Sequence, residues 1–158
     1  MPAHIRVEHS VVSLHKLRRL MSGGLRAGDR RLADEEEPPL ASHLVSPRAG
    51  FAHHGIYVGE GRVVHYGSPS LYLRWGPVEE VSLACFTQGH PIWVRPKSNE
   101  CFRCEEVVTR ARSRIGENQY HLLTNNCEHF CEWCLYGKPR SHQVERIFRW
   151  PRRDCAAG

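Results

Sequence analysis

A glycine turn between two short apolar segments is the feature that most constrains the fold of this chain. In residues 51–58 Ile56 and Val58 alternate with Tyr57, residues 62–66 contain Val63 and Val64, and Gly59-Glu60-Gly61 connects the two segments. This pattern is typical of a β-hairpin. We therefore expect two antiparallel strands, with His53 in the first and His65 in the second near enough to be neighbours on the ladder.

The residues that follow Cys127 predict a short helix that begins at a cysteine. Asn125 or Asn126 would cap it, and Phe130 and Trp133 lie on one helical face together with Cys134. Unpaired amide groups and the helix dipole favour negative charge in a first turn. A Cys127 thiolate would be stabilised there, and the same amides could hold an oxyanion. Cys127 is therefore a candidate nucleophile.

The histidines of the hairpin supply what a nucleophilic thiol needs. One imidazole can take the thiol proton and a second can orient the first. The adjacent His54 leaves open whether it or His53 faces Cys127, because alternation places only one of them on each face. We interpret His129 as a structural group that hydrogen-bonds a neighbouring backbone group.

Strand patterns precede helical patterns along the chain. Beyond the hairpin, residues 78–83 and 91–94 are strand candidates, and the prolines that bound the second favour a sheet edge. A helix is expected near residues 100–115. This segregation predicts an α+β fold, an antiparallel β-sheet packed against helices, and the length suits one domain.

Basic residues gather at the two ends of the chain, which carries a net charge of +5. Residues 1–23 form a basic N-terminal segment with the pattern of a short amphipathic helix, which would lie on an anionic membrane or on the protein itself. Residues 149–158 form a C-terminal tail. Between them, the acidic residues 34–37 and two prolines predict a protruding loop.

Several classes of protein are disfavoured by composition. The aromatic residues are not interleaved with a basic stripe, so we expect no nucleic-acid partner. No signal-peptide pattern is present, and no apolar run approaches the ~20 residues that span a bilayer. We expect a cytoplasmic protein, peripheral to membranes at most, with its seven cysteines reduced. Oligomeric state is not indicated.

Cysteine spacing provides an alternative function. Cys101-x-x-Cys104 and Cys131-x-x-Cys134 could supply four thiolates to a structural zinc ion in a non-catalytic interaction module. Both pairs, however, fall in or at the start of predicted helices without nearby knuckle glycines. We therefore interpret Cys104 and Cys134 as small buried apolar groups and expect no metal or other cofactor.

Three blocks of sequence together resemble the lecithin:retinol acyltransferase (LRAT) family. They are His53-x-x-Ile56-Tyr57-Val58-Gly59, then Val63-Val64-His65, then Tyr120 followed by Asn126-Cys127-Glu128-His129-Phe130. Looser matches extend the resemblance over an LRAT-like catalytic domain at residues 24–148. Such domains are similar to a circularly permuted NlpC/P60, papain-like thiol fold, so this resemblance implies that topology here.

The resemblance also implies roles for individual residues. Cys127 would be the nucleophile, His53 its general base, His65 the group that orients the base, and Tyr120 an aid to the oxyanion. The implied activity is a cysteine-dependent acyltransferase or phospholipase that acts on acyl esters, with glycerophospholipids as the expected substrates. A cysteine peptidase or amidase of NlpC/P60 type is the alternative enzyme.

Overall fold

A computed structural model describes residues 24–49, 51–67 and 75–148 of the chain. Within them lies an α+β fold with an open antiparallel sheet of six strands, in the order β1-β6-β2-β3-β4-β5. The strands are β1 (Arg30–Arg31), β2 (His43–Arg48), β3 (Phe51–Gly59), β4 (Arg62–Tyr66), β5 (Val78–Ser82) and β6 (Trp93–Arg95). The predicted α+β class with an antiparallel sheet is confirmed. The basic segment 1–23 and the tail 149–158 lie outside the described residues.

The predicted hairpin is the centre of the sheet. β3 pairs with β4 around the Gly59-Glu60-Gly61 turn, with Gly55 opposite His65. Glycine suits this turn because Gly59 and Gly61 both have positive φ angles. The expectation that residues 91–94 form an edge was wrong, since β6 lies between β1 and β2. The two residues of β1 cover it.

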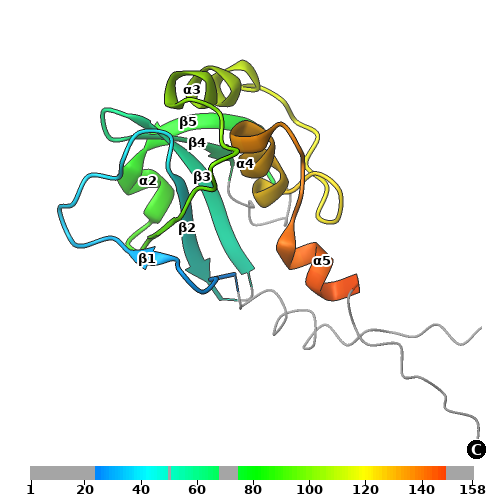
Figure 1. Cartoon of the computed structure of the whole chain (residues 1–158), viewed down its shortest axis with the longest axis horizontal. Coiled ribbons are helices and arrows are strands. Elements are labelled where there is room, and N and C mark those ends of the chain that lie inside the picture. Colours follow the sequence, from blue (N-terminus) through cyan, green and yellow to red (C-terminus); the bar gives the residue numbers. More distant parts are fainter. Residues whose placement is uncertain (1–23, 50, 68–74, 149–158) are drawn as a thin grey trace, which may run out of the picture.

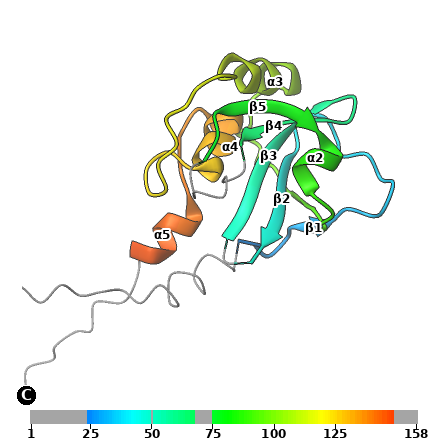
Figure 2. The ribbon, with the colours of Figure 1, turned by 180° about the vertical axis from the view of Figure 1, so that it is seen from behind.

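Four helices accompany the sheet in the described residues: α2 (Leu83–Thr87), α3 (Cys104–Ser113), α4 (Cys127–Tyr136) and α5 (His142–Phe148). The predicted helices near residues 100–115 and after Cys127 are confirmed as α3 and α4. α2 covers one face of the sheet, whereas α3 and α4 cover the other (Figures 1 and 2). No helix among the described residues is both long and apolar enough to cross a bilayer.

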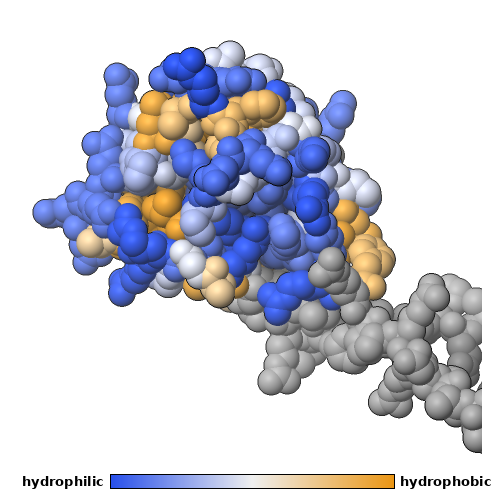
Figure 3. All heavy atoms as spheres, viewed as in Figure 1, coloured by the Kyte–Doolittle hydropathy of each residue, from blue (hydrophilic) through white to orange (hydrophobic). Residues whose placement is uncertain are grey.

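Each face of the sheet contributes to its own apolar cluster. Towards α3 and α4, Ile56 and Val64 pack with Phe130, while Tyr57 and Val63 on the opposite face pack with Phe86 of α2 and its neighbours. Most of the surface seen in Figure 3 is hydrophilic, with separate apolar patches. The sheet is thus buried on both faces, and side chains of adjacent residues in β3 enter different surroundings.

Candidate active site

The cysteine predicted as nucleophile is the first residue of α4. Asn126 caps this helix, because its side-chain oxygen accepts hydrogen bonds from the amides of Glu128 and His129 at 2.9 and 3.0 Å. The His129 ring accepts from the Asn126 amide at 3.2 Å, which completes a capping box and confirms the structural interpretation of His129. The cap holds Cys127 in the first turn, against β3.

The Cys127 sulfur contacts β3 in the part of that strand that does not pair with β4. Pairing with β4 begins at Gly55, so the preceding residues of β3 are not paired with β4. Cys127 Sγ lies 3.8 Å from the carbonyl oxygen of Ala52, and the amide of His54 hydrogen-bonds the sulfur. These two backbone groups flank His53. The sulfur therefore reaches the strand at the position of the predicted base.

Burial keeps the Cys127 thiol protonated at rest. The residue is 3% exposed, and burial raises the pKa of its thiol to about 12. Hydrogen bonding from the amides of His54, Cys127 and Glu128 acts in the opposite direction. These amides would stabilise negative charge once the proton has gone.

His53 and His65 are brought together as the sequence predicted. His53 Nε2 lies 2.8 Å from His65 Nδ1, and both rings are buried. His53 Nδ1 has no hydrogen-bond partner among the described residues. Burial, followed by the charge of His65, holds the pKa of His53 well below its ordinary value, and burial also lowers the pKa of His65 to about 4. His53 is thus a neutral base with one free nitrogen.

His54 points to the other face of β3, into a polar network beneath α4 and α5. Its Nδ1 lies 2.9 Å from His43 Nε2, and its Nε2 lies 2.7 Å from the side-chain nitrogen of Gln143. Burial lowers the pKa of His54 to about 3. Both of its ring nitrogens are therefore engaged, unlike those of His53.

Glu128 anchors the same network. Its carboxylate pairs with Arg26 at 2.6 Å and Arg95 at 3.1 Å, and it accepts a 2.7 Å hydrogen bond from the Ser141 hydroxyl. Burial would raise the pKa of Glu128, but the charge of His54 and these partners hold it at about 2. Beyond its place in the first turn, Glu128 thus ties α4 to β6 and α5.

Tyr120 packs against the apolar cluster that contains Cys127. Burial and the nearby charge of Cys127 raise the pKa of its phenol, so the hydroxyl stays protonated. Its ring stacks on Trp75 with 4.3 Å between centroids, and Trp75 also stacks on His53 at 5.8 Å. The sequence analysis missed Trp75 and also Phe86, which stacks on His53 at 5.0 Å. No motif spacing marked either ring, because both contacts join distant parts of the chain.

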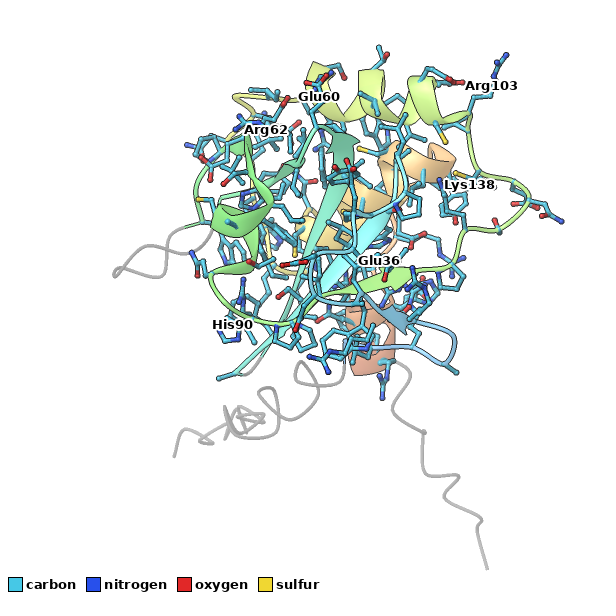
Figure 4. The ribbon with its side chains drawn as sticks, turned by 90° about the vertical axis from the view of Figure 1, so that its left-hand side faces the viewer. Glu36, Glu60, Arg62, His90, Arg103 and Lys138 are labelled. Atoms are coloured by element: carbon cyan, nitrogen blue, oxygen red, sulfur yellow. The ribbon has the colours of Figure 1, made fainter. Side chains whose placement is uncertain are left out.

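No hydrogen bond joins the sulfur to an imidazole nitrogen of the described residues. A hollow of about 790 Å³ on the α2 side is lined by residues that include Glu36, Glu60 and His90, but not by Cys127 or His53. These three lining residues are labelled in Figure 4. Among the described residues, no group of three or more metal-ligating side chains is placed to hold an ion. The cysteine pairs of the zinc alternative instead pack in and against the core beside α3 and α4.

Comparison with known proteins agrees with the resemblance of the three blocks. The family model for lecithin retinol acyltransferase matches residues 36–140. Lecithin retinol acyltransferase of Bos taurus is 30% identical over 132 residues, which cover 66% of this chain and 57% of that protein. Phospholipase A and acyltransferase 3 of Mus musculus is 31% identical over 129 residues, 72% of this chain and 80% of the relative.

A further relative, phospholipase A and acyltransferase 4 of Homo sapiens, is 27% identical over 139 residues, 73% of this chain and 80% of that protein. The chain spans a little over half the length of the lecithin retinol acyltransferases it matches. The family model itself covers most of the chain, including β2 to α4. The chain therefore belongs to the lecithin retinol acyltransferase family.

Proposed function

We propose that this protein transfers acyl groups from a lipid ester through a thioester on Cys127. Depending on the acceptor, it would act as an acyltransferase or as a lipid acyl hydrolase. The names of its relatives, acyltransferase and phospholipase A, support this class of reaction. The observation that carries the proposal is a neutral, buried His53 whose Nδ1 has no hydrogen-bond partner in the described part of the chain and whose backbone neighbours contact the Cys127 sulfur.

The choice of His53 as the base rests on its free nitrogen. A general base needs an unshared lone pair that can reach the proton. His54 has both nitrogens engaged by His43 and Gln143, whereas within residues 24–49, 51–67 and 75–148 His53 is engaged through Nε2, by His65, and not through Nδ1. His65 would fix the ring of His53, as the orienting group of a triad does. The proposed roles of Cys127, His53 and His65 follow from this difference.

Acylation begins with transfer of the thiol proton from Cys127 to His53 Nδ1. The sulfur attacks the ester carbonyl and forms a tetrahedral oxyanion, for which the amides at the start of α4 and the Tyr120 hydroxyl are the available donors. The carbon–oxygen bond then breaks. The alcohol leaves with the proton returned by His53, and the acyl group remains on Cys127 as a thioester.

Deacylation repeats these steps with a new acceptor. His53 takes a proton from water, an alcohol or an amine, whose oxygen or nitrogen attacks the thioester carbonyl. The Cys127 sulfur leaves and recovers its proton from His53. Because the thiol is 3% exposed, an ester reaches it only when the surrounding side chains move aside. We propose a glycerophospholipid as the substrate. We also propose that the fold has the circularly permuted NlpC/P60 topology.

Intact-protein mass spectrometry tests this route directly. The full chain is incubated with a short-chain phosphatidylcholine, quenched in acid and weighed. We expect wild type to gain the mass of one acyl group, which hydroxylamine removes, and we expect Cys127→Ala to gain none. Cys85→Ala is the matched control, because Cys85 is exposed and lies on α2.

Two outcomes would contradict the proposal. An adduct that persists in Cys127→Ala would place the nucleophile elsewhere. Absence of both adduct and lysophospholipid, together with cleavage of small amides, would favour the cysteine amidase alternative.

A further inference from the structure

Two aromatic rings, those of Phe86 and Trp75, stack on the His53 ring. Phe86 approaches with 5.0 Å between centroids and an interplanar angle of 27°, and Trp75 with 5.8 Å and 28°. His65, which contacts Nε2, stands almost perpendicular at 88°. The base therefore contacts one imidazole at its edge and is stacked against two aromatic rings.

The two aromatic rings come from different parts of the chain and contact different neighbours. Phe86 belongs to the apolar cluster beneath α2. Trp75 stacks on Tyr120 at 4.3 Å and 12°, and Tyr120 packs against the other cluster, which contains Cys127. Trp75 thus lies between the base and the aromatic neighbour of the thiol, at the place where β3 has no β4 partner.

We propose that Trp75 is a positioning residue that, together with Phe86, holds the His53 ring and stabilises it when it carries the Cys127 proton. This inference rests on the proposed function. A single hydrogen bond at Nε2 leaves an imidazole free to rotate about that contact. Rings stacked on the imidazole restrict this rotation, so Nδ1 keeps one direction.

The charges around His53 also bear on its protonated state. Burial and the charge of Arg48 disfavour an imidazolium at His53, and protonation of His65 or His54 would disfavour it further. The carboxylate of Glu79 lies 3.5 Å from Nε2 of His65. An aromatic face attracts a cation, most strongly where water is excluded and most strongly for tryptophan. Among the described neighbours, the ring faces of Phe86 and Trp75 are the groups that favour protonation of His53.

Alkylation of Cys127 by iodoacetamide across pH tests this without a lipid. Loss of the indole should lower the share of the thiolate–imidazolium pair. For Trp75→Leu we expect roughly tenfold slower alkylation at neutral pH, the scale of a desolvated cation–π contact, and a rate–pH midpoint shifted upward. Trp75→Phe keeps a ring and should restore most of the rate. Trp93→Phe, on β6, is the matched tryptophan control and should resemble wild type.

Turnover of a short-chain phosphatidylcholine provides a second readout. Trp75→Leu should lower kcat with little change in KM, since the indole acts through the base. A wild-type alkylation profile in Trp75→Leu, or an effect on KM alone, would overturn the inference. Should Trp75→Leu fail to fold by circular dichroism, Trp75→Met replaces it under the same criteria.

His53→Ala separates this inference from the proposed function. If that variant alkylates like wild type, His53 is not the base and both proposals fall. If His53→Ala is slow while Trp75→Leu is normal, the function stands and only the role of Trp75 is wrong. Slow alkylation in both, with recovery in Trp75→Phe, supports the inference.

Discussion

His53 and His54 are consecutive, completely buried imidazoles on one strand, yet their surroundings differ in kind. His54 enters a polar network in which both of its nitrogens have partners. His53 enters an aromatic setting in which Nε2 meets His65 and Nδ1 has no described partner. Because a buried polar atom without a partner is costly, its retention points to a use. The fully paired ring is suited to holding the fold, and the incompletely paired ring to moving a proton.

The largest expected effect is on activity when these two histidines are exchanged for glutamine separately. A positioned general base typically contributes 10²–10⁴-fold, so we expect His53→Gln to slow acyl-enzyme formation by about that factor. For His54→Gln we expect a loss of less than about tenfold in the folded protein, because its ring holds structure. Single-turnover mass spectrometry with a short-chain phosphatidylcholine measures both. The opposite ranking would assign the base to His54.

Sequence reasoning succeeded where the determinants are local. The hairpin follows from alternation around two turn glycines, and the Asn126 cap follows from a side chain that bonds amides two and three residues on. β2 was missed because its only adjacent apolar residues are Leu44 and Val45, which is too short a run to mark a strand. The structure tolerates Pro47 because β6 pairs only with His43 to Val45, so the proline lies beyond that ladder.

The rest of the candidate site depends on contacts that no local pattern encodes. Alternation predicted that His53 and His54 face opposite sides but not which helix covers each side. That depends on where α4 and α2 pack. Trp75 and Phe86 join His53 from 22 and 33 residues away along the chain. Their participation follows from the meeting of two apolar clusters at the end of β4.

The next effect concerns stability on the His54 side of β3. Glu128→Gln would remove the shared carboxylate charge from Arg26 and Arg95. Breaking a buried ion pair by removing one partner costs about 3–5 kcal/mol of unfolding free energy. Urea denaturation of the full chain measures it. Glu80→Gln, in a largely exposed pair with Arg112, is the control and should change stability by less than about 1 kcal/mol. Similar losses in both variants would contradict the structural role of this network.

Acid should weaken the fold through these same imidazoles. The folded pKa of His54 is lowered to about 3 and that of His65 to about 4, whereas both are near 6.5 when unfolded. As pH falls below 6.5 the unfolded chain binds protons first, so stability is lost from pH 6.5 towards pH 3. For His54 alone, the loss between pH 7 and pH 4 is on the order of 3 kcal/mol. Urea curves at the two pH values measure it.

The acid response of His54→Gln tests the contribution of the His54 ring to this loss of stability. His54→Gln should be less stable than wild type at pH 7 and should lose less on acidification, because one of the depressed groups is gone. The lowered pKa of Glu128, about 2, adds a further loss only as pH falls from about 4.5. An unfolding free energy that stays constant from pH 7 to pH 4 would mean that these rings are not buried in their neutral form.

The smallest effect is expected at Asn126, which caps α4 next to Cys127. Asn126→Ala would remove the cap that holds the first turn of α4 and should cost about 1–2 kcal/mol. Because the same cap places Cys127 against β3, we expect acyl-enzyme formation to slow as well, whereas Asn126→Asp should retain both properties. Urea denaturation and single-turnover acylation measure the pair. If stability falls while acylation is unchanged, contact with β3 alone positions the sulfur, and the cap serves only the fold.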